Sequence, residues 1–195
     1  MKRVAGTALL MCLLVIVVSL MLGLSGARTA LQDERAARNE RDRKAAFQAA
    51  EAALLDAQHD IEQPGGSLRG ALFASAAPAF PTECGAGAAN PLQGLCAGMG
   101  VRPSWLTVDF MDDGAGSARS VAYGRFTGQT MQVGSATLPA RLPRYLIEVH
   151  ADRRAGAAAD LASAGVLYQI SAVGFGTRDD TRVLLQVWYR RMGGN

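Results

Sequence analysis

The sequence predicts an α+β protein in which one long amino-terminal helix packs on a carboxy-terminal antiparallel β-sheet. Three observations predict this fold. No side chain is charged from Val4 to Ala27, and residues 29–62 contain neither proline nor glycine and are rich in alanine. Beyond Arg102, apolar and polar residues alternate, and β-branched and aromatic residues become frequent. The long helix is therefore expected first and the sheet after it.

The first element is an apolar helix. A helix crosses the hydrocarbon of a bilayer with about 20 residues, so the uncharged run is long enough to span a membrane. A secretory signal would have an apolar centre of only about 7 to 15 residues. Lys2 and Arg3 precede the run and predict a cytoplasmic amino terminus, with everything after Arg28 on the other side.

The helix is expected to continue without a break to Glu62, because the first stop signal is the sequence Pro64, Gly65, Gly66. One face of its second half carries an apolar stripe that must cover another element: Phe47, Ala50, Leu54, Ala57 and Ile61. Residues 28–44 are polar nearly all round, which fits either a solvated stalk or a contact surface. Weak helix formers at positions 23, 25 and 26 predict local softness or bending.

Residues 64–100 are rich in glycine, alanine and proline and are expected to form a loop, with a short helix over residues 68–76. Cys84 and Cys96 lie in this loop. On the outer side of the membrane such a pair is expected to form a disulfide, which stabilises a domain by about 3 kcal/mol in the loop-entropy model. Cys12, within the apolar run, is expected to be an inert apolar side chain.

The sheet is expected from five strand-like segments. Residues 104–111 and 119–126 are predicted to form a hairpin-like pair, and residues 144–150 follow with Tyr145, Ile147 and Val149 on one face. Residues 166–176 and 181–191 flank a short polar turn and predict a terminal antiparallel hairpin.

Several function classes lack support in the sequence. The net charge of +3 is small and the basic residues are interleaved with acids, so no nucleic acid partner is expected. His59 and His150 have no second ligand at metal-binding spacing, and neither a metal nor a cofactor is expected. No nucleophile stands in a recognisable catalytic setting, so no catalytic residue is assigned and the protein is not expected to be an enzyme.

The segment "LQDERAARNERDRKAAFQAAEAALLDAQ", from Leu31 to Gln58, resembles the amino-terminal region of PilX-type minor pilins of type IV pili. The closing segment, residues 168–191, is similar to the last hairpin of these proteins. The resemblance implies the type IV pilin fold. It also implies that Gly6 ends a cytoplasmic leader removed by prepilin peptidase and that Thr7 becomes the methylated amino terminus. The expected divisions are then the leader 1–6, a transmembrane helix 7–27, a periplasmic helix 28–62 and a globular head 63–195.

The sequence departs from major pilins at two positions of this resemblance. Thr7 replaces the usual phenylalanine, and Met11 occupies the position of a glutamate that pairs with the amino terminus of a neighbouring subunit. A carboxylate within the bilayer costs about 2.5 to 3.5 kcal/mol on insertion scales unless it finds a partner. A subunit without the acid offers no such partner, which suits a place near the end of a fibre.

The resemblance implies a minor pilin that primes or caps pilus assembly at the inner membrane and supports pilus biogenesis, adhesion and twitching motility. Its expected partners are prepilin peptidase, other minor pilins, the major pilin and a pilus tip adhesin. Two alternatives stay open: a tip pseudopilin of a type II secretion system, and a single-span periplasmic sensor or enzyme.

Overall fold

The computed structural model describes residues 7–62, 69–74, 78–98, 102–134, 137–152 and 166–191. Helix α1 runs from Thr7 to Glu62, as the missing proline and glycine after residue 28 predict. The predicted helical start at Val4 lies outside the described residues. The chain divides into two compact units, Met1–Arg41 and Asp42–Asn195, and the boundary falls within α1.

The first unit consists of the amino-terminal part of α1, and its described side chains are exposed. In the described part of the chain, α1 is the helix that is long and apolar enough to cross a membrane, by its length and composition. The helix is unbroken through Gly23 and Gly26, and the Thr29 Oγ1 donates a hydrogen bond of 3.1 Å to the backbone oxygen of Ser25. The predicted softness of this segment stays a prediction.

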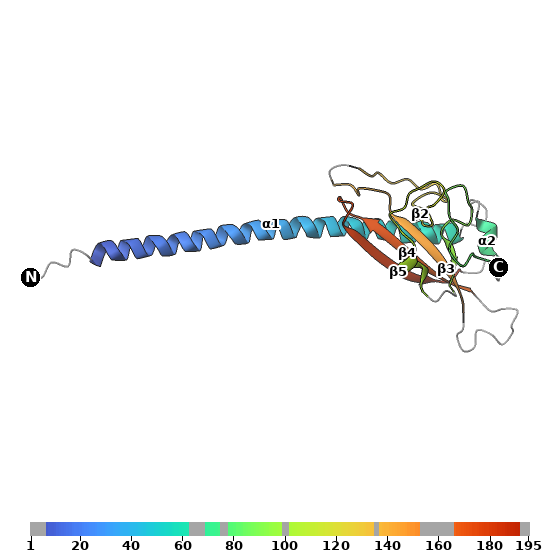
Figure 1. The fold of residues 1–195 in the computed structure, drawn as a ribbon, viewed down its shortest axis with the longest axis horizontal. Coiled ribbons are helices and arrows are strands. Elements are labelled where there is room, and N and C mark those ends of the chain that lie inside the picture. Colours follow the sequence, from blue (N-terminus) through green and yellow to red (C-terminus); the bar gives the residue numbers. More distant parts are fainter. Residues whose placement is uncertain are drawn as a thin grey trace, which may run out of the picture. The chain divides into compact units, whose positions relative to one another are not determined.

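The second unit contains one mostly antiparallel sheet (Figure 1). Its strands are β1 (Leu95–Ala97), β2 (Val121–Ala122), β3 (Arg144–Ala151), β4 (Val166–Phe175) and β5 (Arg182–Tyr189). The order is β1-β3-β4-β5, and β2 also pairs with β3. Strand β1 is parallel to β3, whereas the other pairs are antiparallel. The fold is therefore α+β, as the sequence predicts.

The second half of α1 covers one face of this sheet, the inner face. Ala53, Ala57 and Ile61 pack there in one core cluster with Tyr145 and Ile170. The predicted stripe is confirmed for Ala50, Ala57 and Ile61, which are buried. It is wrong for Phe47, which is 43% exposed, because small residues, above all alanines at 46, 49, 50 and 53, occupy the contact instead.

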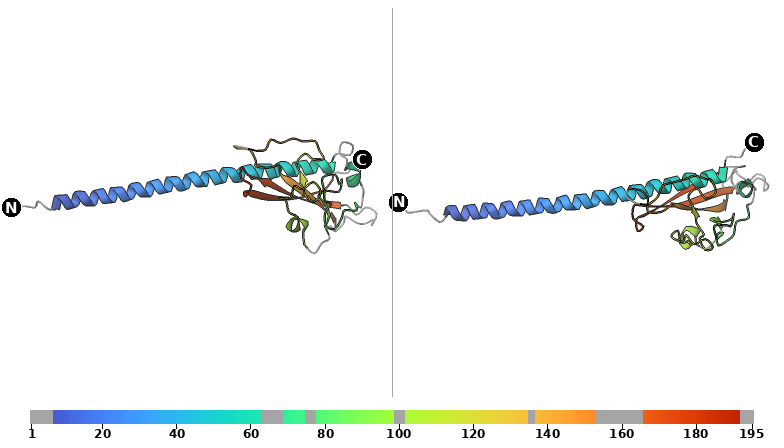
Figure 2. Two further views of the ribbon diagram at one scale, coloured as in Figure 1. Left: turned by 45° about the horizontal axis from the view of Figure 1, so that its top comes forward. Right: turned by 90° about the horizontal axis from the view of Figure 1, so that it is seen from above.

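A second cluster covers the opposite, outer face of the sheet. Leu146, Val173 and Phe175 point to this face and pack with Val108 and Phe110, beside the paired cysteines. In the right-hand view of Figure 2, the sheet lies between the end of α1 and the segment that contains α3 (Ser104–Thr107). The sheet is thus covered on both faces over β3 and β4.

The predicted strand at residues 104–111 is wrong. Helix α3 occupies its first half, and Val108 and Phe110 are buried on the outer face of the sheet without a strand partner. Their alternation reflects an extended segment that buries every second side chain, which a periodicity of two cannot distinguish from a paired strand. The hairpin with residues 119–126 is therefore wrong as well, and only Val121–Ala122 of that segment forms a strand.

The terminal hairpin is confirmed, since β4 pairs antiparallel with β5 with Ile170 opposite Val187. Helix α2 covers Gly70–Ala74, within the predicted range of 68–76, of which residues 68 and 75–76 lie outside the described residues. The predicted loop over residues 64–100 contains an element that the sequence did not predict. Strand β1 pairs parallel with β3 there, with Cys96 opposite Glu148.

Candidate functional site

The amino-terminal part of α1 presents the first candidate surface. Thr7 is the first described residue, and Gly6 lies outside the described part of the chain. Met11 is 66% exposed among other exposed apolar side chains, and the first described turn of α1 contains no acidic residue. A helix that leaves a long apolar surface uncovered requires a lipid or protein environment. This surface can therefore act as an anchor or as an assembly contact.

Asp42 connects α1 to the turn between β4 and β5. Its buried carboxylate accepts hydrogen bonds from the backbone N–H and the Oγ1 of Thr177, from the Oγ1 of Thr181 and from the Nε of Arg178. Burial raises the pKa of Asp42, but the hydrogen bonds from Thr181, Thr177 and Arg178 outweigh it and lower the pKa to about 2. The carboxylate is thus held in its charged form at the start of the second compact unit.

The sequence predicts either a solvated stalk or a contact surface for residues 28–44, and the structure buries Asp42 against the β4–β5 turn, so this residue is not solvated. A signal was present. Asp42 precedes Ala46 by four residues and Ala49 by seven, so it continues the buried face of the helix. The amphipathic pattern hides this relation because it scores an acid as exposed.

Asp56 and Asp60 extend the same face toward the end of α1. Asp56 accepts hydrogen bonds from the Gly124 N–H (2.7 Å) and from the Oγ1 of Thr127. Burial raises the pKa of Asp56, and these two hydrogen bonds lower it in part. Each carboxylate therefore ties α1 to a distant segment of the head.

Asp60 lies at the centre of a buried polar cluster. It forms an ion pair with Arg69 just before α2 and accepts a hydrogen bond of 3.0 Å from the Tyr145 hydroxyl. Arg69 also donates to the backbone oxygen of Gln93 and lies 3.9 Å from the centre of the Phe126 ring. Burial raises the pKa of Tyr145 well above its usual value. The cluster joins α1, α2, β3 and the disulfide loop.

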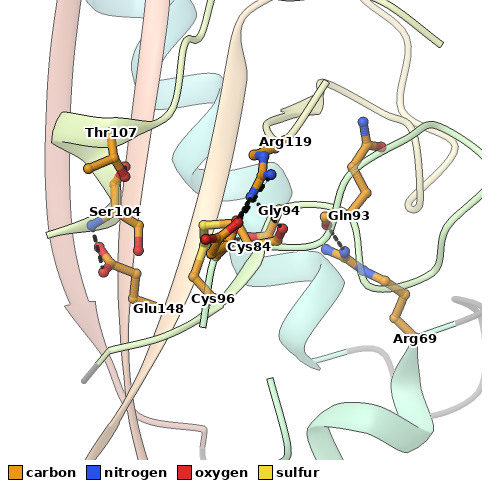
Figure 3. Close-up of a disulfide and its surroundings, with 10 residues drawn as sticks. Arg69, Cys84, Gln93, Gly94, Cys96, Ser104, Thr107, Arg119 and Glu148 are labelled. Carbon is orange, nitrogen blue, oxygen red and sulfur yellow. Dashed lines mark hydrogen bonds and ion pairs between the residues drawn. A yellow bond between two sulfur atoms is a disulfide. The ribbon is translucent and has the colours of Figure 1, made fainter. Parts of the chain in front are cut away.

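The disulfide joins Cys84 and Cys96, the pair that the sequence predicts, with 4.1 Å between the Cα atoms. Figure 3 shows Arg119 above this disulfide, where it bonds the backbone oxygen and the carboxylate of Glu83. To the left of the disulfide in this view, the N–H of Ser104 donates to Glu148 at 3.0 Å. The disulfide and these hydrogen bonds therefore hold the loop against the rest of the head.

The buried acids of α1 each contact distant segments of the chain. Within the described ranges, no group of three or more His, Cys, Asp or Glu side chains could hold a metal ion. His150 packs against Trp188 with 4.9 Å between the ring centres.

Comparison with protein families gives two matches that together cover most of the chain. Residues 5–55 match the family model described as PilX N-terminal. Residues 74–191 match the model described as Type IV pilus assembly protein PilX C-term. The chain belongs to the PilX family of type IV pilus assembly proteins.

PilX proteins are structural pilus components of the minor pilin kind, and the exposed apolar helix of this PilX protein fits a pilin-type anchor that could span a membrane. The family also indicates interaction with other pilus components. Neither the curated proteins nor the solved structures contain a match to this PilX chain.

Proposed function

We propose that this PilX protein primes or caps type IV pilus assembly at the inner membrane, as a minor pilin without catalytic activity. The observation that carries the proposal is the exposed apolar part of α1, continuous in one helix with the segment that packs in the head. Such a helix can lie in lipid before assembly and pack against other pilin helices afterwards, since both surroundings accept apolar side chains.

The proposed divisions of the chain are a leader at 1–6, a transmembrane helix at 7–27, a periplasmic helical half at 28–62 and the head at 63–195. Lys2 and Arg3 support a cytoplasmic amino terminus with a periplasmic head. Prepilin peptidase would cut after Gly6 and leave Thr7 as the methylated terminus. Removal of two cations eases extraction of the helix from the membrane face into a fibre.

A place at the end of the fibre is supported by Met11. A subunit that has methionine there supplies no carboxylate to the amino terminus of the next subunit. Such a subunit is better suited to start a fibre than to repeat along it. Its partners would be other minor pilins, the major pilin and a tip adhesin, through which it would support adhesion and twitching motility.

The test combines processing with pilus counts. In a host that has prepilin peptidase, the intact mass should lack residues 1–6, whereas Gly6→Val should keep them. Deletion of the gene should remove most surface pili in electron micrographs, and the wild-type chain but not Gly6→Val should restore them. An uncut chain would contradict the pilin processing, and normal pili with failed protein secretion would favour a type II secretion pseudopilin.

A further inference from the structure

Strand β5 forms an open edge of the sheet. It is last in the order β1-β3-β4-β5, and in the described part of the chain no strand pairs with its outer side. A long edge strand presents unpaired backbone N–H and C=O groups that can pair with another chain. Proteins usually protect such an edge with charges, proline or a bulge. The sequence of β5, RVLLQVWY, has one charge, at its first residue.

The side chains of β5 are apolar on both faces and incompletely covered. Val183, Leu185, Val187 and Tyr189 face inward and are half-buried, whereas their neighbours on β4, Ile170 and Ala172, are fully buried. On the outer face Leu184 is 38% exposed and Trp188 is 54% exposed. The cover that α1 and the disulfide loop give to β3 and β4 therefore ends before this edge.

A pocket lies beside the beginning of β5 on the outer face. Helix α3 and the segment that follows it form one wall, with Trp105, Val108 and Phe110 as its apolar part and Asp109 as its acidic part. Val173 of β4 contributes from the sheet, and Leu184 and Arg182 line the side toward the edge. A side chain from a strand placed next to β5 on this face would meet this pocket and Leu184.

We propose that the free edge of β5 binds an extended segment of a partner polypeptide, which adds to the sheet as a further strand. Its apolar side chains, at every second position, would meet Leu184 on the outer face, its intervening side chains would lie beside Val187 on the inner face, and an acidic residue would face Arg182. The unpaired backbone groups of β5 can hydrogen-bond only to an extended chain. Because successive side chains of a strand point to opposite faces, every second residue of the bound segment meets the same face of the sheet.

Charge favours a different polypeptide over a second copy of this chain. In the described structure Arg182 is exposed and has no acidic partner. A second copy of β5 has no acidic residue to place beside Arg182, since RVLLQVWY contains none. An acidic end on a different partner segment supplies that charge.

The test uses a fluorescent, end-blocked peptide of eight residues, with valine alternating with threonine and glutamate at both ends. Its binding to the full chain in detergent is followed by fluorescence anisotropy. Leu184→Glu should weaken binding at least about tenfold, because it puts a charge beside the apolar segment. Val133→Glu is the matched control, since Val133 is also 38% exposed but lies outside β5, and should bind as the wild type does.

A charge exchange keeps the test decisive if Leu184→Glu does not fold. Arg182→Glu should weaken binding of the glutamate-ended peptide and restore binding of a lysine-ended one. A peptide with proline in place of two threonines should bind weakly, because proline cannot donate to the edge.

Equal binding by the Leu184→Glu and Val133→Glu variants, or no binding to the wild type, would overturn the proposal. A dimer in sedimentation that is lost in Leu184→Glu would replace it with self-association. These measurements require no pili, so their failure leaves the proposed role in assembly untouched.

Discussion

At the scale of single residues, Asp42 is the acid whose environment differs most from its apparent place in the sequence. It stands in a run of alternating charges, of which Glu34 and Arg38 form an exposed pair of the ordinary kind. Asp42 instead satisfies the donors of the β4–β5 turn. The four hydrogen bonds hold the turn against α1. This carboxylate therefore stabilises the contact between α1 and the sheet.

We expect Asp42→Asn to lower the free energy of unfolding of the head by about 1 to 3 kcal/mol at neutral pH, because a charged acceptor of several hydrogen bonds is lost. The folded pKa of about 2 is below the usual 3.8, so the stabilisation by Asp42 is complete above about pH 4 and is lost as the pH falls through 2. Urea unfolding followed by tryptophan fluorescence at several pH values measures both effects.

The control for this prediction is Glu51→Gln, on the exposed face of the same helix. It removes one negative charge without touching the β4–β5 turn. An Asp42→Asn variant whose stability equals that of Glu51→Gln at neutral pH would show that the turn does not depend on the carboxylate.

The partners of these acids explain why residue-level patterns could not predict them. Asp42 bonds residues more than 130 positions away, and Asp56 bonds Gly124 and Thr127 about 70 positions away. A helix pattern reports which residues share a face but not what covers it. The disulfide was predictable because only Cys84 and Cys96 follow the apolar helix, and two cysteines in an oxidising compartment can form only one intramolecular pair.

At the scale of elements, the contact between α1 and the sheet depends on Gly174. A Cβ atom at this position would lie 2.0 Å from the backbone oxygen of Ala46 and 2.3 Å from the backbone nitrogen of Ala50. Both obstacles are backbone atoms, which cannot turn aside as a side chain does. The glycine on β4 and the alanines on α1 together allow the close approach of helix and strand.

We expect Gly174→Ala to lower the free energy of unfolding by about 1 to 3 kcal/mol, the usual cost of overpacking, because helix and sheet must move apart. Gly116→Ala is the matched control, since a Cβ there meets nothing within 4 Å. Thermal unfolding of both variants gives the comparison. Equal melting temperatures would mean that the contact has room to relax.

Among the elements, those with a strong local signal were predicted and those defined by distant partners were not. The long helix, β3 and the β4–β5 hairpin have continuous propensity, alternation or a short polar turn. Strand β1 has three residues and exists because it pairs with β3 about 50 positions later. Apolar and polar residues alternate in part of the segment 104–111 because Val108 and Phe110 cover the sheet. The predicted burial of alternate side chains was therefore correct there, but the predicted strand pairing was wrong.

At the scale of the whole molecule, Met11 bears on where the subunit enters a fibre. We expect Met11→Glu to change the amount of this protein in sheared pili, because a carboxylate there can pair with the amino terminus of a neighbouring subunit. The insertion penalty of about 2.5 to 3.5 kcal/mol for an acid in the bilayer also favours transfer of the helix out of lipid. Immunoblots of sheared fibres, normalised to the cellular level, measure the change.

Met11→Gln is the control, since it is polar at the same position without a charge. Unchanged abundance of Met11→Glu in the fibres, with unchanged cellular level and processing, would contradict the proposed meaning of the missing acid. A loss of the protein from the membrane would instead show that the anchor, and not the assembly step, was disturbed.

The disulfide has a practical consequence for Cys12. Of three cysteines in the chain, two are joined in the head, and Cys12 is the remaining thiol, exposed on the apolar part of α1. A maleimide spin label added to the oxidised natural chain in detergent, before transfer into lipid, would therefore have a single thiol to which it can attach. Its accessibility to oxygen and to aqueous nickel complexes would report how deep the beginning of the helix sits in a bilayer, with no engineered residue.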